Sequence, residues 1–439
     1  MKGSKKQFFK AFKLFLLIAL LLLTISSCNK KTGKAQAAEK VFSPSLTTDT
    51  KASIKICGNY SNFEALEAEF DRFNQIYPEV ELTYSFLDNY NNVIVSSLYS
   101  DEAPDIFFLF PWMMGRTQYE VLFEIAEDLS LPELNINLDC IYEGNLLKTS
   151  DGKVPVLPMY SQGYGMLVNE DLFKRENLKV PATLPELLDV CQKLKTAGYK
   201  SPIMGFTDGT ANIFSSIAYP YSHYLVKDNA KAQEALNNMD AAAGEYMRPL
   251  YELIDRLVAT DCFDLNYCKQ EFTDNYNGVI LRFFEGDIPM LLIYGDVVSG
   301  TKKRESKSDA FTASPFKYRM YPTPVTDKGG IFISNTGTGF AVNSKSKQLA
   351  ITNEFIRFLT QTAELNNLAT NKHLIPITKD FSSDELFAPM GNGIKVYANT
   401  TTLLDDVQKQ IRTSCSNIAN GLITVDEAVK QYGQIDNTQ

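Results

Sequence analysis

DGKVPVLPMYSQGYGMLVNEDLF, residues 151–173, is the stretch of this sequence that does most to decide the fold. It opens on an Asp-Gly turn, and two spaced prolines then hold the backbone extended and prevent a helix from starting. Tyr160, Gln162 and Tyr164 follow at alternate positions, which on a strand would place two rings and an amide on one face. Asn169 then caps a short helix. A stiff, aromatic, glycine-spaced stretch in the first half of a long chain predicts a crossing between two lobes.

The length and composition are those of a globular protein with more than one core. A chain of 439 residues is long for a single core, so two domains are expected. Its residues are 44% hydrophobic and 22% charged, which is ordinary for a globular protein. The first 27 residues hold five lysines and no acidic residue, so the remainder carries a net charge of −14 against −9 for the whole chain. This acidic balance argues against a nucleic-acid partner, because no basic stripe is present to replace counterions.

The cysteines and histidines do not form a metal-binding pattern. The closest cysteine pair, Cys262 and Cys268, lacks the two-residue spacing of a zinc knuckle or a redox motif. With only His223 and His373 available, we expect neither a metal site nor a cofactor, and we expect His223 to be structural. Whether the six cysteines after Cys28 pair or stay reduced is open.

The N-terminus has the pattern of a bacterial lipoprotein signal. Residues 1–13 are basic, and the apolar run that follows, about a dozen residues, is too short for a permanent membrane span. Ile25-Ser26-Ser27-Cys28 resembles a lipobox, which implies a signal peptide over residues 1–27 and a diacylglyceryl group on Cys28, with acyl chains such as palmitate. The alternative is an ordinary secretory signal with a chance cysteine. Residues 28–51 are polar and aperiodic, so we expect a flexible tether that holds an extracytoplasmic protein at the cell membrane.

Strands and helices alternate before and after the opening stretch. A strand over residues 53–58, an amphipathic helix over residues 62–77 and a strand over residues 80–86 come first. The continuous apolar run PDIFFLF, residues 104–110, is typical of a strand covered on both faces. This order predicts an α/β lobe with a mainly parallel sheet. Helices dominate after residue 183, with one further buried strand in DIPMLLIYGD, residues 287–296.

Two later stretches repeat the character of the opening one. Phe316–Gly330 holds tyrosines, spaced prolines and a glycine turn, and His373–Thr378 is a proline-bounded strand. We therefore predict three crossings, with a hinge at Leu157–Ser161. The resulting fold class is a two-lobed α/β clamshell, in which each lobe has a mainly parallel sheet flanked by helices. The predicted lobes are discontinuous: residues 52–158 plus 325–372 form the N-terminal lobe, and residues 159–324 plus 373–439 form the C-terminal lobe.

No catalytic motif supports an enzyme, and we predict no catalytic residues. The sequence has no nucleophile elbow, phosphate loop, dinucleotide fingerprint or zincin helix. Gly337-Thr338-Gly339 lacks the third glycine and the preceding buried strand that a nucleotide-binding loop needs. A surface glycosidase is the enzyme alternative, because acids such as Asp105 and Asp296 are available, but no motif places two of them together.

Three loops follow candidate strands at their carboxyl ends, where open α/β sheets bind ligands. They hold Asn59 and Tyr60, then Trp112, then Tyr294 and Asp296. Aromatic rings stack on the apolar patches of a pyranose, and amides and carboxylates bind its hydroxyls, so these residue types suit a sugar. Each residue has the alternative of being an ordinary loop or core residue, and Tyr219, Tyr221 and Tyr224 are left out of the set. The candidate ligand-binding residues are Asn59, Tyr60, Trp112, Tyr160, Gln162, Tyr164, Phe206, Tyr294, Asp296 and Asn335.

Several stretches, taken in order, carry a family resemblance. They are FNQIYPEVELTY, APDIFFLF, the run of residues 151–198, FFEGDIPMLLIYGD, YPTPVTDKGG and NEFIRFLTQTAELNNLATNKHLIP. Over nearly the whole mature chain the sequence resembles family 1 of the bacterial extracellular solute-binding proteins, the maltose-binding-like components of ABC importers. The resemblance implies two lobes joined by hinge strands, a cleft that closes on its ligand, no catalysis and, most often, a sugar ligand.

The sequence departs from the family at two aromatic positions. Family members often have tryptophan directly after the threonine of a P-x-T-W motif, where Leu184 follows Thr183 here. They also often have an aromatic residue or tryptophan after the buried methionine strand, where this chain has Tyr294 and Asp296. These departures count against a long maltodextrin and leave a shorter sugar or a polar non-sugar solute open.

We therefore expect a monomeric, lipid-anchored receptor that captures a mono- or oligosaccharide and delivers it to the transmembrane permease subunits of an ABC transporter. The alternatives are a receptor of the same fold for a non-sugar solute and a binding protein that serves a sensor kinase.

Overall fold

A computed structural model describes residues 42–207, 209, 212–272, 276–399 and 402–434. The expected signal peptide, the lipid-attachment residue Cys28 and the first part of the expected tether, residues 28–41, lie outside these residues. No helix of the described part combines the length and hydropathy of a membrane span. No disulfide joins the six cysteines that the structure describes.

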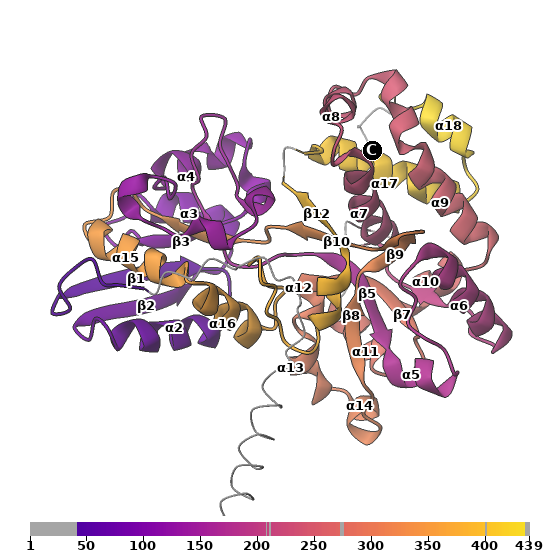
Figure 1. Cartoon of the computed structure of the whole chain (residues 1–439), viewed down its shortest axis with the longest axis horizontal. Coiled ribbons are helices and arrows are strands. Elements are labelled where there is room, and N and C mark those ends of the chain that lie inside the picture. The colour runs from indigo at the N-terminus through magenta and orange to yellow at the C-terminus, as the bar shows by residue number, and fades with distance from the viewer. Residues whose placement is uncertain (1–41, 208, 210–211, 273–275, 400–401, 435–439) are drawn as a thin grey trace, which may run out of the picture. The chain divides into compact units, whose positions relative to one another are not determined.

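The first lobe is built on one five-stranded sheet in the order β2-β1-β3-β11-β4. β1 pairs in parallel with β2 and β3, whereas β11 is antiparallel to β3 and β4. All four residues of β3 are buried, which confirms the strand predicted from PDIFFLF. The strands are β1 (Ala52–Gly58), β2 (Val80–Phe86), β3 (Ile106–Leu109), β4 (Leu157–Pro158) and β11 (Gly339–Val342). The helices are α2 (Glu64–Asn74), α3 (Tyr90–Ser97), α4 (Glu120–Ile125), α15 (Leu349–Leu359) and α16 (Thr362–Lys372) (Figure 1).

The second lobe has two sheets, in the orders β6-β7-β5-β8 and β12-β10-β9 (Figure 1). Their strands are β5 (Tyr164–Asn169), β6 (Ile203–Met204), β7 (Met290–Tyr294), β8 (Tyr318–Tyr321), β9 (Thr323–Thr326), β10 (Gly329–Asn335) and β12 (Ile394–Ala398). The helices are α5 (Glu170–Arg175), α6 (Leu184–Thr196), α7 (Ile213–Val226), α8 (Ala230–Asn237), α9 (Arg248–Ala259), α10 (Leu265–Glu271), α11 (Tyr276–Phe283), α12 (Gly295–Val298), α13 (Thr301–Glu305), α14 (Asp309–Ala313), α17 (Asp405–Ala419) and α18 (Val425–Lys430). Short 3₁₀ helices are η1 (Pro111–Met113), η2 (Thr117–Tyr119), η3 (Pro132–Leu134), η4 (Leu138–Cys140), η5 (Glu143–Asn145), η6 (Ala241–Met247) and η7 (Ala388–Asn392).

The sheets are mixed, where the sequence predicted mainly parallel ones. In the second lobe β5 runs antiparallel to β7 and β8, and β9 runs antiparallel to β10. Only β6 with β7 and β10 with β12 pair in parallel there. The physical reason is that β5 enters its sheet from a crossing and not from a strand-helix-strand unit, so no crossover helix fixes its direction.

Helix starts in the second lobe follow the capping residues that the sequence shows. Asn169 accepts a hydrogen bond from the Leu172 backbone N–H at 2.9 Å and so begins α5. Thr183 and Glu186 form a reciprocal capping box at the start of α6. Because α5 begins directly after β5, the crossing stretch is held at its far end by a fixed helix terminus.

Three crossing segments join the lobes, and they lie side by side around Ser161. Ser161 forms antiparallel bridges with Thr336 and with Ile375. Its backbone N–H donates to the Ile375 carbonyl at 2.9 Å, and the Met159 N–H donates to the Thr338 carbonyl at 3.0 Å. The first crossing therefore lies between the other two, with backbone hydrogen bonds to both.

The second crossing does not lie at Phe316–Gly330, where the sequence predicted it. β8, β9 and β10 all stay in the second lobe, and Ile331 and Ile333 of β10 are buried in its core. The chain returns to the first lobe only between Asn335 and Gly339, so the predicted boundary at residue 325 is also displaced. Prolines and tyrosines correctly signal extended backbone, but they do not indicate which core a strand joins.

Two glycines allow the crossing segments to pack closely. A Cβ added at Gly337 would lie 2.4 Å from the ring of Tyr160, closer than real Cβ atoms come. Gly163 has φ +57°, and a Cβ there would lie 2.6 Å from the side chain of Ile375. A larger residue at either position would therefore push the crossings apart.

Residues 42–51, which the sequence placed in a flexible tether, instead pack against α15. The carboxylate of Glu354 accepts the backbone N–H of Ser45 at 2.8 Å and its hydroxyl at 2.5 Å. Arg357 pairs with Glu354 at 2.7 Å and donates to the Ser43 carbonyl at 2.6 Å. This buried pair binds the start of the described chain to the first lobe, so the expected tether is too long at its C-terminal end.

Glu354→Ala is expected to lower the free energy of unfolding by about 3 kcal/mol, because it leaves Arg357 buried without its counter-charge. Denaturant unfolding followed by circular dichroism measures the loss, and hydrogen exchange should become faster over residues 42–51. Asp189→Ala is the control, because Asp189 pairs with Lys193 on an exposed helix surface, where such pairs contribute little. Equal losses in the two variants would contradict the anchoring role of Glu354.

Candidate ligand-binding site

Five of the predicted residues lie together beside the crossings. We call Tyr60, Tyr160, Gln162, Asp296 and Asn335 the Asp296 cluster. The Tyr60 hydroxyl donates to that of Tyr160 at 3.2 Å, and burial together with the nearby Asp296 carboxylate raises the pKa of both hydroxyls. Gln162 Nε2 donates to Asp296 Oδ2 at 3.3 Å, and Asn335 Nδ2 donates to Gln162 Oε1 at 3.1 Å. The first lobe, two crossings and the second lobe all contribute to this cluster.

Local backbone geometry fixes the members of the cluster. The Gln162 N–H donates to the Asn335 carbonyl at 2.8 Å, and the Gln162 carbonyl accepts the Gly295 N–H at 3.0 Å. A Cβ at Gly295 would lie 2.3 Å from the Gln162 oxygen, so only glycine permits this approach. The approach places Asp296, in the first turn of α12, directly against the crossing strand.

The polar side chains next to Asp296 in the described part of the protein, Tyr160 and Gln162, are uncharged. Burial raises the pKa of Asp296 to about 7, although the neighbouring Tyr160 hydroxyl and the hydrogen bond from Gln162 act in the opposite direction. Its Oδ1 is enclosed and has no hydrogen-bond partner among the described residues. A donor brought by a ligand would satisfy this oxygen, which is otherwise an unfavourable buried acceptor.

Three tyrosines form a row next to the cluster. Tyr164 of β5 is paired in register with Tyr294 of β7, and their ring centroids are 5.9 Å apart. Tyr219 of α7 extends the row, with its ring centroid 4.9 Å from that of Tyr164. We call Tyr164, Tyr219 and Tyr294 the tyrosine row. Such a surface offers apolar ring faces together with hydroxyl groups.

His223 supports this row from inside α7. Its ring centroid is 4.4 Å from that of Tyr219, and its Nδ1 lies 2.8 Å from the Tyr219 carbonyl oxygen. Burial lowers the pKa of His223 to about 4, so the imidazole is neutral near pH 7. A buried neutral ring that packs on its own helix is a structural residue.

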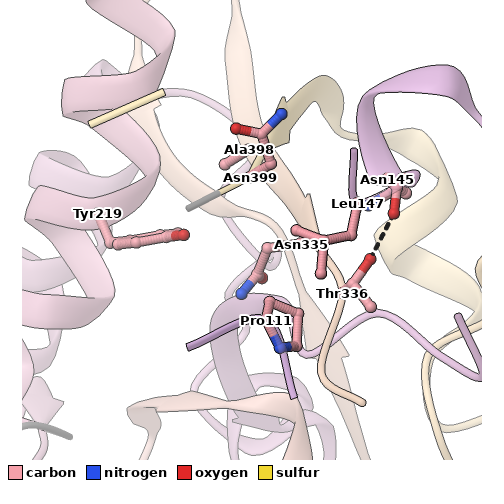
Figure 2. A pocket seen from close by; sticks show the side chains of 8 residues that line it. All are labelled: Pro111, Asn145, Leu147, Tyr219, Asn335, Thr336, Ala398 and Asn399. Carbon is pink, nitrogen blue, oxygen red and sulfur yellow. Dashed lines mark hydrogen bonds between the residues drawn. The ribbon is translucent and has the colours of Figure 1, made fainter. Parts of the chain in front are cut away.

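A small pocket opens beside the tyrosine row. Tyr219 points from α7 into it, and on the opposite side the Thr336 hydroxyl donates to the Asn145 carbonyl at 2.7 Å (Figure 2). Asn335 belongs to this pocket as well as to the Asp296 cluster, so the two regions are continuous. The residues that line the pocket are Pro111, Asn145, Leu147, Tyr219, Asn335, Thr336, Ala398 and Asn399.

Three predicted residues lie elsewhere. Phe206 is 4% exposed, lies in the core of the second lobe near Phe272 and is not among the residues that line the pocket. Asn59 is exposed in the loop after β1. Trp112 packs in η1, with the Arg116 guanidinium 5.0 Å from its ring centroid, and its neighbour Pro111 reaches the pocket.

The sequence reasoning missed several pocket residues. Tyr219 carries a weak signal, because it belongs to a group of three tyrosines in residues 219–224. Thr336 lies in the glycine-spaced stretch NTGTGF, whose pattern suggests only a weak nucleotide loop. Asn145 and Asn399 carried no signal, since they reach the pocket only through the packing of η5 against the end of β12.

Comparison with known proteins agrees with this architecture. The sequence pattern of the bacterial extracellular solute-binding proteins matches residues 58–364, well over half of the chain. The chain belongs to this family. The family resemblance and the two-lobed α/β fold that the sequence predicted are thereby confirmed.

Several known proteins are similar to this chain in sequence or in structure. The melibiose/raffinose/stachyose-binding protein MelE of Bacillus subtilis (strain 168) is 22% identical over 367 residues, which cover 81% of this chain and 78% of MelE. The apo-form of RafE from Streptococcus pneumoniae superposes with a TM-score of 0.66 at 15% identity, covering 90% of this chain and 98% of RafE. A sugar transporter of Bacillus licheniformis in complex with stachyose has a TM-score of 0.54 at 19% identity, covering 87% and 98% of the two chains. The family that matches is one of extracellular solute-binding proteins, and MelE is itself a binding protein.

The pKa of Asp296 leads to a pH-dependent prediction. The folded-state pKa of Asp296, about 7, lies above the usual aspartate value. The protein with protonated Asp296 is therefore more stable than the protein with charged Asp296. The resulting stabilisation is complete below a pH of about 4 and is lost as the pH rises through about 7. Asp296→Asn cannot ionise, so its melting temperature should rise relative to that of the natural protein as the pH increases from mildly acidic to mildly alkaline.

Calorimetric melting temperatures across that pH range test this expectation. Asp189→Asn serves as the control, because it makes the same substitution at a carboxylate on an exposed helix surface. If the melting temperatures of Asp296→Asn and of the natural protein changed in parallel with pH, folding would not change the pKa of the Asp296 carboxylate.

Proposed function

We propose that this protein is a lipid-anchored extracytoplasmic receptor that captures a mono- or oligosaccharide between its lobes and delivers it to the permease subunits of an ABC transporter. The observation that carries the proposal is the junction of the tyrosine row with the Asp296 cluster. Ring faces lie there next to a carboxylate with a vacant acceptor, beside the segments that join the lobes.

The chemistry of this junction suits a polyhydroxylated ligand. Pyranose rings have apolar C–H faces that stack on aromatic side chains, and their hydroxyl groups both donate and accept hydrogen bonds. Asp296 supplies an acceptor through Oδ1, while Gln162 and Asn335 supply amides that are already oriented by hydrogen bonds to each other. Preordered polar groups reduce the entropy lost when the ligand binds.

The relatives narrow the ligand class. MelE is described as binding melibiose, raffinose and stachyose, and the Bacillus licheniformis protein was solved with stachyose. Both proteins are similar to most of this chain, so these di- to tetrasaccharides are the first ligands to test. They also fit the absence of tryptophan after Thr183, where members of the family often have it, and the presence of Tyr294 and Asp296 after the buried methionine strand.

Delivery to the permease requires that ligand binding change how the two lobes are arranged relative to each other. A ligand shifts a conformational equilibrium only by its difference in affinity for the two states. A sugar that contacts Tyr60 of the first lobe and Asp296 of the second meets this condition, because it contacts both lobes only when they approach. The conformation with approached lobes is then the one that we propose the permease recognises.

Membrane attachment is assigned to Cys28 on the lipobox-like sequence alone. In cells fed radiolabelled palmitate, the natural protein should incorporate label and sediment with membranes, and Cys28→Ala should do neither. Labelling of the variant would contradict attachment at this residue, whereas sugar binding should be the same in both proteins.

Melibiose, raffinose or stachyose should raise the melting temperature of the purified protein, because a ligand that binds only the folded state stabilises it. Tyr219→Ala should weaken binding by roughly tenfold in isothermal titration calorimetry, because it removes one ring face from the site. Tyr99→Ala is the control, since Tyr99 is 65% exposed and distant in sequence from the site elements.

The same screen separates the alternatives. A shift with amino acids or polyamines and none with sugars would replace the sugar assignment by that of another solute. Release of smaller sugars from a bound oligosaccharide would overturn the non-enzyme assignment. If the protein binds a sugar, but a strain that lacks the protein still takes up that sugar at the normal rate, a sensor-kinase partner is favoured over the permease.

A further inference from the structure

A buried carboxyl group of the first lobe lies outside the ligand-binding site, where α16 packs against α2. Glu69, in the middle of α2, is 0% exposed. Arg72, one turn further along α2, donates to Oε1 of Glu69, and its Nε donates to Oε2 of Glu364 on α16 at 2.6 Å. Two carboxyl groups from two helices therefore share one guanidinium. We call Glu69, Arg72 and Glu364 the Glu69 group.

The charges of the Glu69 group do not balance if both carboxyl groups are ionised. Arg72 supplies one positive charge, and it is the basic partner that pairs with Glu69 and Glu364 within the described part of the chain. A second negative charge away from water would be unfavourable, so one carboxyl group is expected to keep its proton. Oε2 of Glu69 is enclosed and has no donor beside it, which suits an oxygen that itself carries a proton.

The two carboxyl groups differ in how well they hold a negative charge. Glu364 lies in the first turn of α16, where the helix macrodipole favours an anion, and its side chain is 16% exposed. Glu69 has neither advantage. Burial and the neighbouring Glu364 raise the pKa of Glu69 to about 9, although Arg72 acts in the opposite direction. The proton therefore belongs on Glu69 near neutral pH.

The other charged residues around α2 are exposed or engaged elsewhere. α15 and β2 also pack against α2. On α15, Glu354 and Arg357 bond to each other, and Glu81 of β2 and the other acidic residues of α2 are exposed. Lys372 lies at the far end of α16. Titration at this contact is thus confined to the Glu69 group.

α16 connects the contact to the ligand-binding site and to the crossings. At its C-terminal end, the Lys372 ammonium lies 4.4 Å from the ring centroid of Tyr60, a member of the Asp296 cluster. The chain then enters the crossing in which the Ile375 carbonyl accepts the Ser161 N–H. The way in which α16 is held on α2 therefore bears on Tyr60 and on one of the three crossings.

We propose that Glu69 and Glu364 form a proton-sharing pair, in which the Glu69 carboxyl group donates its proton to the Glu364 carboxylate and Arg72 holds both. The bound proton fastens α16 to α2. Its loss to solvent places two negative charges side by side and weakens the contact. The pair is independent of the ligand, so a failure of the sugar assignment would leave it unaffected.

The melting temperature of Glu69→Gln across pH tests the pair. Because the folded-state pKa of Glu69 is raised, its stabilisation is complete below a pH of about 4 and is lost as the pH rises through about 9. Glu69→Gln cannot ionise and keeps an N–H donor toward Glu364. Its melting temperature should rise relative to that of the natural protein by roughly 2 °C per pH unit above a pH of about 7, and the difference should level off beyond about 9. Glu67→Gln is the control, because it makes the same substitution at an exposed position of the same helix.

A second measurement follows the proton directly. In protein labelled with ¹³C at the glutamate carboxyl groups, the resonance that Glu69→Gln removes should be that of a neutral carboxyl group near neutral pH. In Glu364→Gln the same resonance should titrate at a lower pH, because the neighbouring negative charge is gone. An ionised Glu69 at neutral pH, a titration that Glu364→Gln leaves unchanged, or a melting-temperature difference that does not vary with pH would each overturn the pair.

Discussion

The pairing of three crossing segments around Ser161 is the constraint on which the rest of the structure depends. Because Ser161 bridges Thr336 on one side and Ile375 on the other, the segments that connect the lobes share one set of backbone hydrogen bonds. Gly163 and Gly337 make that approach possible. A hinge built from three paired strands restricts the lobes to motions that bend all three together, which is the condition for a cleft that opens and closes as a unit.

The same pairing creates the site. Tyr160 and Gln162 flank Ser161 on the first crossing, and Asn335 lies at the start of the second, so the backbone contacts that join the crossings also bring these side chains to Asp296. Burying a carboxylate with only uncharged partners is unfavourable, and the raised pKa of Asp296 expresses this cost. Binding sites commonly retain such unfavourable groups, because the ligand supplies the missing interaction.

Sequence reasoning selects candidate residues from local signals. Proline and glycine spacing points to Tyr160 and Gln162, and the ends of buried strands point to Tyr60 and Asp296, because ligand sites of open α/β sheets lie at strand ends. The structure places these four side chains close to one another. It placed the second crossing too early, since the extended stretch before Gly330 is a hairpin of the second lobe. It also proposed Phe206, an aromatic residue that follows a short strand but is buried in the core.

The sequence by itself determined the two-lobed α/β class, the family and the existence of several crossings. These properties follow from patterns within short windows, where apolar periodicity, proline, glycine and capping residues act on their neighbours. Only the tertiary structure decided which lobe β9 and β10 join and which side chains meet. Asn145, Tyr219 and Asn399 come from distant parts of the chain, and they line one pocket because η5, α7 and β12 pack around the crossings.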